Sequence, residues 1–328
     1  MEEEIKKYRK DTAGSIMTTK VPVVFNNDSI GTIVDLLTKY SSQFDSINYV
    51  YVLNGRKKLA GVLSIKELFR QKKRVKVKDV MVDELVVVRV NTDQEKVVYK
   101  ALKYNIKALP VVDKNGFFLG LVQSDDILRV LKKETEEDLF QMAGVVNKKG
   151  SFDNILNISV FKSVSHRFPW LFVGILGGLL IARIIGIFEE TIYDNIVLIM
   201  FIPLVTYIAS AVSTQMSTFM IRDLAVNGNF LFFRYFFKNF LIVISIAVMS
   251  GLSFFLIDMF FYGDIKTGII LSVAIFSAIL SSLFSGLFVP FSLSRAGIDP
   301  ANASGPFGTI LQDTLSILIY FSVISLML

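Results

Sequence analysis

Five long apolar stretches fill the second half of the chain and constrain its fold more than any other feature. Each is nearly free of charge and has the roughly 20 residues that a helix needs to cross the hydrocarbon core of a bilayer. Their approximate ranges are 168–188, 196–221, 239–257, 267–294 and 306–328. The sequence therefore predicts an all-α membrane domain of five transmembrane helices over residues 168–328, in which the long fourth helix tilts or bends at Pro290.

The first half is a different kind of sequence. Residues 1–168 hold 29 of the 35 Lys and Arg and 21 of the 29 Asp and Glu. Because basic and acidic residues are mixed, a solvated surface near anionic lipid headgroups is favoured over a nucleic-acid-binding surface. Cysteine is absent, which excludes a disulfide framework and a thiolate metal site. The stretch Met1 to Glu4 lacks the apolar core of a cleaved signal, so we expect this half to stay in the cytoplasm.

Charges between the apolar runs predict the orientation. With a cytoplasmic N-terminus, the inner side carries the basic residues Lys162, Arg167, Arg222, Arg234, Lys238 and Arg295. The outer side carries one basic residue, Lys266, and the acidic residues Glu189, Glu190, Asp194, Asp258 and Asp264. This distribution follows the positive-inside rule. We therefore expect a multi-pass protein of the plasma (inner) membrane, with the C-terminus outside.

Two segments of the polar half, 15–76 and 77–144, read alike and predict an internal repeat. Each copy has an apolar run, an amphipathic helix, two β-rich runs around an Asn-Gly turn, and a closing helix. Asn-Gly between β-branched runs is the strongest short signal for a hairpin. The expected turns are Asn54-Gly55 and Asn115-Gly116. The amphipathic helices are expected to begin at Asp28-Ser29 and at Asp93 to Glu95, and the closing helices are expected over 66–71 and 125–133.

This β-α-β-β-α order resembles a tandem pair of CBS domains, most specifically in Leu109 to Asp113 followed by Gly120 to Val122. The resemblance implies an α+β module that commonly dimerises, and many such pairs bind adenosine ligands between the repeats. That site usually has Ser or Thr, two residues and then Asp. This chain departs from the pattern in both copies, and the matching positions for an adenine nucleotide are Ser64, Glu67 and Asp126.

Asp313 is the most informative ionisable residue of the apolar half. It lies seven residues into a final helix that begins near Pro306, and no Lys or Arg lies within one helical turn of it. A carboxylate there must face a polar cavity, pair with another helix or be protonated. Hydroxyls and one amide also follow the second run, at Thr206, Ser210, Ser213, Thr214, Gln215, Ser217 and Thr218. Helix packing through small polar residues explains such a stripe too, but together with Asp313 it favours a cation pathway.

Several stretches resemble the MgtE family of magnesium transporters. They are Asp299 to Pro306 with Thr309 and Asp313, Arg167 to Leu171, Phe201 to Leu204, and Gln215 with Arg222 to Ala225. The similarity covers residues 12 to 328. It implies a homodimer in which the second and fifth spans line a pore and the aspartate matching Asp313 holds hydrated Mg²⁺. Thr214, Gln215 and the backbone of Gly305 and Pro306 would assist as further ligands.

The acidic tract Glu134 to Asp138 lies just past the second repeat. A charge run is usually a solvated helix face, but carboxylates that repel each other also bind divalent cations. In MgtE proteins a similar tract takes part in magnesium sensing. The residues expected to sense intracellular cation are Asp125, Asp126, Glu134, Glu137 and Asp138. A segment 1–14 precedes the CBS pair, and a connecting helix over 145–167 would link the pair to the membrane domain.

Two departures from the family pattern leave alternatives open. Members usually read Gly-Asn-x-Gly-x-Gln before the second-span glutamine, whereas this chain reads Ser210 to Gln215 as Ser-Ala-Val-Ser-Thr-Gln. Many members also have an acidic helical domain ahead of the CBS pair. In this sequence only about a dozen residues precede the pair, so we expect gating that does not use such a domain. A coupled divalent-cation efflux transporter of the same fold and a non-conducting membrane cation sensor remain alternatives. An enzyme is not expected, because His166 is the only histidine and no nucleophile–base pair or phosphate-binding loop is present.

Overall fold

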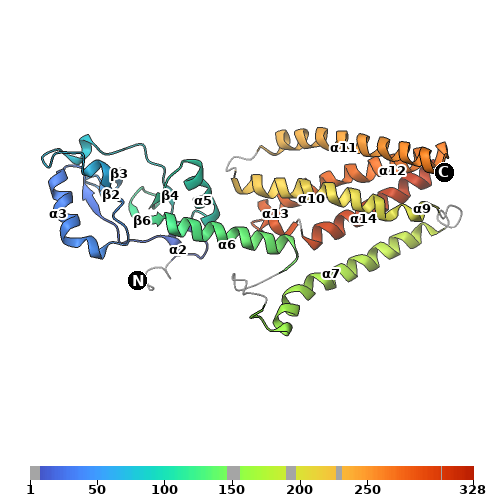
Figure 1. Ribbon diagram of the computed structural model, residues 1–328, viewed down its shortest axis with the longest axis horizontal. Coiled ribbons are helices and arrows are strands. Elements are labelled where there is room, and N and C mark those ends of the chain that lie inside the picture. Colours follow the sequence, from blue (N-terminus) through green and yellow to red (C-terminus); the bar gives the residue numbers. More distant parts are fainter. Residues whose placement is uncertain (1–7, 146–155, 190–196, 227–230, 304) are drawn as a thin grey trace. The chain divides into compact units, whose positions relative to one another are not determined.

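The computed structural model describes residues 8–145, 156–189, 197–226, 231–303 and 305–328. The chain divides into two compact units, Met1–Glu134 and Thr135–Leu328. The strands of the described residues all lie in the first unit, and the long apolar helices lie in the second (Figure 1).

The N-terminal unit contains two three-stranded sheets of the same topology. In each, the first strand runs parallel to the second, and the second pairs antiparallel with the third. The strands are β1 (Val23–Phe25), β2 (Tyr49–Leu53), β3 (Leu59–Ser64), β4 (Val88–Arg89), β5 (Ala108–Val112) and β6 (Phe118–Gln123). The predicted repeat is therefore confirmed.

Both predicted hairpins are present, but their turns differ. In the second turn Gly116 has φ of 85°, the left-handed conformation that glycine adopts without strain. In the first turn the left-handed residue is Lys57, with φ of 59°, rather than Gly55. The side chain of Asn54 accepts the N–H groups of Arg56 and Lys58 there. Asn-Gly alone predicts a two-residue turn, whereas this turn is longer and Asn54 stabilises it with its side chain.

Helices flank each sheet. They are α2 (Ala13–Ile16), α3 (Ile30–Tyr40), α4 (Ile65–Leu68), α5 (Gln94–Lys103) and α6 (Ser124–Met142). The predicted helix starts are confirmed, because the Ser29 hydroxyl accepts the N–H of Thr32 and the Asp93 carboxylate accepts the N–H of Glu95. The last helix differs from the prediction. It continues to Met142, so the acidic tract Glu134–Asp138 forms part of α6.

The C-terminal unit has five helices long and apolar enough to span a membrane among the described residues, as the sequence predicted. These spans are Val160–Ile187, Val197–Ala225, Phe232–Phe261, Ile265–Arg295 and Pro306–Met327. Their helices are α7 (Val160–Ile187), α9 (Val197–Met200), α10 (Ile202–Val226), α11 (Phe232–Phe261), α12 (Ile265–Leu283), α13 (Val289–Arg295) and α14 (Pro306–Met327).

The first and third spans begin earlier than residues 168 and 239, where we expected them. The cause is that Lys162 and Arg167 lie on the first turns of α7, and Arg234 and Lys238 lie on those of α11. A helix extends past its apolar stretch when long basic side chains at its end reach water. Of the predicted connecting helix 145–167, residues 146–155 lie outside the described part and 160–167 belong to α7.

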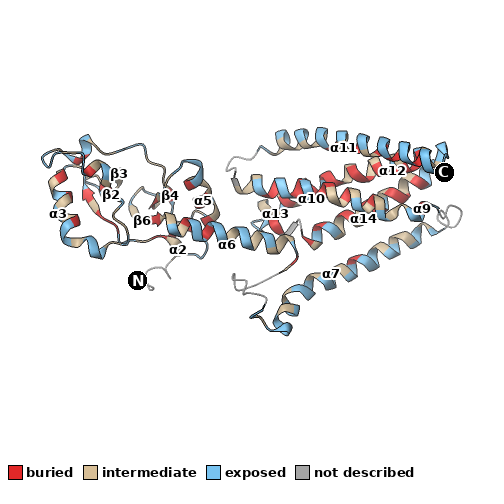
Figure 2. Cartoon of the chain, viewed as in Figure 1, coloured by how far each residue is buried: buried red, intermediate tan, exposed pale blue. Residues whose placement is uncertain are grey.

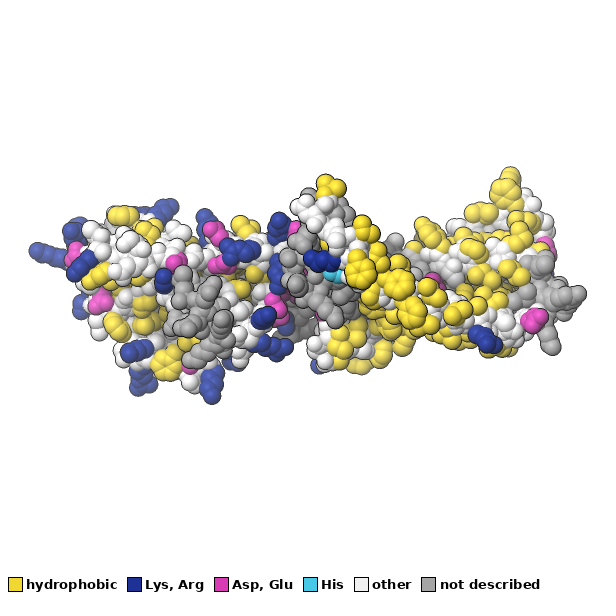
Figure 3. Space-filling model, turned by 90° about the horizontal axis from the view of Figure 1, so that it is seen from below, with side chains coloured by type: hydrophobic (Ala, Val, Ile, Leu, Met, Phe, Trp, Pro, Cys, Tyr) yellow, Lys and Arg dark blue, Asp and Glu magenta, His cyan; other side chains and the backbone are white. Residues whose placement is uncertain are grey.

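The fourth span occupies the middle of the helical unit. Half of its most apolar window is buried, against 6% for α7, and α12 packs against α10, α11 and α14 (Figure 2). The helix α7 packs on α14 through Gly177, where a Cβ would lie 2.3 Å from Ile310 Cγ2. Exposed hydrophobic side chains cover the visible surface of these helices, whereas Lys and Arg gather on the N-terminal unit (Figure 3).

Prolines mark two irregularities in the spans. In the fourth span, the residues Phe284–Phe288 form a π-turn in which the N–H of Val289 donates to the carbonyl of Phe284. The predicted bend at Pro290 is thus replaced by a widened turn just before it, since proline cannot donate a helical hydrogen bond. In the second span, α9 and α10 are interrupted at Phe201, two residues before Pro203.

A buried polar network joins α14 to the fourth span. Gln312 is fully buried, and its Nε2 donates to Ser281 Oγ at 3.0 Å and to Ser316 Oγ at 2.9 Å. Ser285, in the π-turn, donates to Gln312 Oε1 and lies 2.7 Å from the hydroxyl of Ser213 on α10. Each donor and acceptor of the amide side chain is therefore used inside the helix bundle, where leaving a polar group unpaired is costly.

We expect Gln312→Leu to lower the stability of the folded protein by on the order of 2 kcal/mol, because it removes the partner of several buried hydroxyls. The matched control is Gln215→Leu, since Gln215 is an exposed amide on α10. The apparent melting temperature in detergent compares them. Equal shifts for both variants would contradict the structural role of the network.

Candidate cation and nucleotide sites

The carboxylate of Asp313 lies part-way along α14 and is half-buried. Its Oδ1 accepts a hydrogen bond of 2.6 Å from Ser210 Oγ on α10. None of the ion pairs between described residues involves Asp313. A structural ion pair is one way to accommodate a carboxylate in a membrane helix, and in the described part of the chain Asp313 does not form one.

A small polar cleft lies between α10 and α14 and is lined by Ser210, the hydrogen-bond partner of Asp313, though not by Asp313 itself. Its volume of about 10 Å³ is close to the space that one water occupies. It is lined by Ser210, Ser213, Thr214, Ser217, Gly308, Thr309 and Gln312. The Ser217 hydroxyl is buried and has no hydrogen-bond partner among the described residues. The cleft therefore offers oxygen atoms, the kind of ligand that hard cations and their waters prefer.

The structure places one of the predicted cation ligands in the cleft. Thr214 lines the cleft, and Gln215 is exposed on the next position of α10. Gly305 caps α14 and Pro306 is its first residue, seven residues before Asp313, which is roughly 11 Å along a helix. They line a separate groove with Trp170 and Gly174, and a Cβ on Gly305 would meet the Gln141 carbonyl at 2.9 Å. No group of three or more His, Asp or Glu side chains suited to a metal occurs in the described ranges.

The five predicted sensing residues all lie on α6 but do not form one cluster. Asp125 and Asp126 are in its first turn, and Glu134 follows eight residues after Asp126, roughly 12 Å along the helix. Glu134 accepts a hydrogen bond of 2.5 Å from Gln94 in the N-terminal unit. Glu137 and Asp138 belong to the second unit.

Asp138 has an unusual environment for an acidic residue. Burial, with the carboxylates of Asp299 and Glu137 nearby, raises its pKa to about 6. The charged form of Asp138 is therefore disfavoured, and a proton or a bound cation would relieve the repulsion.

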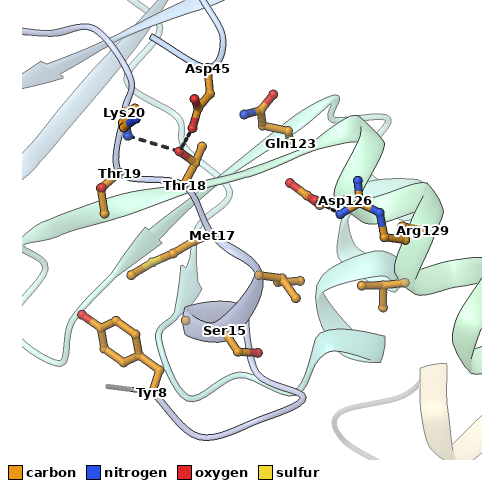
Figure 4. A pocket seen from close by; sticks show the side chains of 13 residues that line it. Tyr8, Ser15, Met17, Thr18, Thr19, Lys20, Asp45, Gln123, Asp126 and Arg129 are labelled. Atoms are coloured by element: carbon orange, nitrogen blue, oxygen red, sulfur yellow. Dashed lines mark hydrogen bonds and ion pairs between the residues drawn. The ribbon is translucent and has the colours of Figure 1, made fainter. Parts of the chain in front are cut away.

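A larger pocket lies in the N-terminal unit, with a volume of about 450 Å³ (Figure 4). It is lined by Tyr8, Gly14, Ser15, Ile16, Met17, Thr18, Thr19, Lys20, Asp45, Gln123, Asp126, Arg129 and Val130. Asp126 extends into it from α6 and forms an ion pair of 2.8 Å with Arg129. Partial burial raises the pKa of Asp126, and the Arg129 guanidinium opposes that shift. On the opposite side, the hydroxyl of Thr18 donates to Asp45.

Of the three residues predicted to bind a nucleotide, Asp126 lines this pocket, and Ser64 and Glu67 do not. Ser64 caps α4 by accepting the N–H of Glu67, and the Glu67 side chain bonds to Arg70 and Gln71. Residues 14–20, which the sequence did not indicate as part of a ligand site, also line the pocket. Sequence reasoning also missed Gln312, although it adjoins Asp313 and faces a serine-rich stretch of the fourth span.

Family models match both halves of the chain. The MgtE model, described as a divalent cation transporter, matches residues 202–323, and the CBS domain model matches residues 13–73 and 77–133. Among solved structures, the cytosolic domain of the Mg²⁺ channel MgtE in complex with ATP is 34% identical, with a TM-score of 0.38, over 39% of this chain and 52% of that chain. This chain thus spans about half of that solved chain.

Curated relatives extend over nearly the whole sequence. The chain is 30% identical over 318 residues to the magnesium transporter MgtE of Bacillus subtilis (strain 168), covering 96% of this chain and 69% of the relative. It is 30% identical over 331 residues to the magnesium transporter MgtE of Thermus thermophilus, covering 99% of this chain and 72% of the relative. A CBS pair, five apolar helices and this similarity together place the chain in the MgtE family of divalent cation transporters.

Proposed function

We propose that this protein carries Mg²⁺ across the membrane, with Asp313 as the main ligand on the pathway. The observation that carries the proposal is the half-buried Asp313 carboxylate, which accepts a hydrogen bond from Ser210, one of the residues that line a cleft with oxygen atoms. A carboxylate is costly in a membrane helix unless it faces a polar cavity or finds polar partners, and such residues commonly mark ion pathways. The curated relatives named as magnesium transporters support Mg²⁺ as the ion.

The chemistry of the site suits a hydrated cation. Mg²⁺ dehydrates reluctantly and is usually bound through one or two carboxylates while it keeps several waters. Asp313 would hold the ion, and Thr214 and Gln215 would accept or donate hydrogen bonds to those waters. Gly305 and Pro306 would act further along the path, through backbone carbonyls at the start of α14.

We further propose a homodimer in which α10 and α14 of each chain face a shared axis. One carboxylate is a weak site for a divalent cation, and a second copy would contribute another Asp313. Thr214 and Gln215 are exposed on α10, which leaves polar side chains facing away from the bundle. Such a face suits a water-filled path between two chains and is costly against lipid.

The orientation and the domain limits belong to the same proposal. The N-terminal unit would lie in the cytoplasm and the C-terminus outside, since basic residues gather at the span ends on one side. The CBS repeats would occupy 15–76 and 77–144, and the linker 145–167. The protein would act as a transporter and not as an enzyme, consistent with the description of its family.

Regulation would come from the CBS pair. Cations would be sensed by Asp125, Asp126, Glu134, Glu137 and Asp138, and the raised pKa of Asp138 supports such a role, because a bound ion relieves its repulsion with Asp299. The pocket around Asp126 would bind an adenine nucleotide. Its volume of about 450 Å³ lies in the range of small-ligand sites, and a related MgtE cytosolic domain is described in complex with ATP.

Transport is tested by Mg²⁺ influx into proteoliposomes. We expect influx with the parent protein and its loss, by on the order of 100-fold or more, in Asp313→Asn, because the variant removes the charge that offsets cation desolvation. Asp264→Asn is the control, since it also removes one carboxylate but preserves a helix cap outside the spans. Normal influx in Asp313→Asn would refute Asp313 as the main ligand.

Regulation is tested by limited proteolysis of the full chain, since a ligand that binds the folded state slows cleavage. ATP should protect the parent and Glu67→Ala but not Asp126→Ala. Millimolar Mg²⁺ should protect the parent but not Asp138→Asn. If neither ATP nor Mg²⁺ changes the rate of cleavage of the parent protein, both regulatory assignments are contradicted.

A further inference from the structure

We propose that Ser210 is a positioning residue that makes the Asp313 carboxylate selective for Mg²⁺ over Ca²⁺. The inference rests on the proposed function and concerns one contact within it. Ser210 Oγ donates to Asp313 Oδ1 at 2.6 Å, a distance typical of a strong hydrogen bond from a hydroxyl to a carboxylate. One of the two carboxylate oxygens is therefore engaged by the protein itself.

The contact is built into the packing of α10 against α14. Gln312 precedes Asp313, and neighbouring residues of an α-helix point about 100° apart. The Gln312 amide is bonded to Ser281 and Ser285 of the fourth span, which fixes the rotation of α14 about its axis. With Gln312 turned toward the fourth span, Asp313 is turned toward α10 and meets Ser210.

The same chain of hydroxyls holds α10 in place. Ser213 lies one turn after Ser210 and its hydroxyl is 2.7 Å from Ser285 Oγ, the group that also bonds Gln312. The two helices that carry Ser210 and Asp313 are thus tied to one serine of the π-turn. This arrangement limits how far the carboxylate can rotate away from the hydroxyl.

The hydrogen bond changes how the carboxylate can bind a metal. Ca²⁺ takes six to eight oxygen ligands in flexible geometry and often uses both oxygens of one carboxylate. Mg²⁺ requires near-octahedral geometry and keeps several waters while it binds one or two carboxylates, so it has little need of both oxygens of one carboxylate. Because Oδ1 accepts a hydrogen bond from the Ser210 hydroxyl, bidentate binding would compete with that bond, whereas none of the hydrogen bonds found between described residues involves Oδ2. The contact therefore disfavours Ca²⁺ and leaves Mg²⁺ binding intact.

The experiment measures Mg²⁺ influx into proteoliposomes at increasing external Ca²⁺, and its readout is the Ca²⁺ concentration that halves influx. We expect Ser210→Ala to lower that concentration on the order of five-fold, because it frees Oδ1 for Ca²⁺. Ser210→Thr keeps the hydroxyl and should behave as the parent. Ser322→Ala is the matched control, since Ser322 lies on α14 and, among the described residues, its hydroxyl bonds to the Leu318 carbonyl of its own helix.

Unchanged Ca²⁺ sensitivity in Ser210→Ala would overturn the proposal. Equal changes of Ca²⁺ sensitivity in Ser210→Ala and Ser210→Thr would also overturn it, because they would indicate that the size of the side chain matters and not its hydroxyl. If Ser210→Ala does not fold, Ser210→Cys replaces it, because a thiol is a weak donor. Asp313→Asn separates the two claims. Loss of influx in that variant with no effect in Ser210→Ala refutes only the role of Ser210, whereas retained influx in Asp313→Asn refutes the proposed function.

Discussion

The desolvation of one carboxylate is the constraint on which the helical unit depends. An aspartate in an apolar helix must have polar partners, and Asp313 finds one in Ser210 across the α10–α14 contact. The hydroxyl stripe of α10, the buried amide of Gln312 and the serines of the fourth span line up along this contact. Their placement explains why so many small polar residues occur in helices that are otherwise strongly hydrophobic.

The fourth span holds this arrangement together. It is the most buried of the five candidate spans in the described ranges, and it contacts α10, α11 and α14. Its π-turn carries Ser285 into the polar network, and a Cβ on Gly286 would lie 2.8 Å from the carbonyl of Ser213. Pro290 prevents regular helical bonding just after this turn. The irregularity therefore lies where the backbone of α10 approaches the fourth span closely.

The sequence predicted the architecture well and the internal contacts poorly. Long apolar runs and a repeat with Asn-Gly turns are local signals, so the five spans and the two sheets could be read directly. Helix ends were less predictable, because Lys162 and Arg234 belong to helices whose apolar stretch starts later. The Gln312 network joins residues that are 27 to 31 positions apart, and no local pattern indicates which serines an amide meets. The family resemblance did predict a ligand site at Asp126, which lines the pocket, but it also named Ser64 and Glu67, which do not line it.

Water access along α10 tests the central claim most directly, namely that α10 and α14 line a cation path. The chain has no cysteine, so a single introduced thiol reports on one position. In the liposome-embedded protein, Thr214→Cys should react with a charged, membrane-impermeant thiol reagent, and Mg²⁺ should slow the reaction. Val248→Cys, on the exposed apolar face of α11, should stay unreactive. If the thiol at position 214 reacts as little as the thiol at position 248, a pathway along these helices is contradicted. The same holds if Mg²⁺ does not slow the reaction of the thiol at position 214.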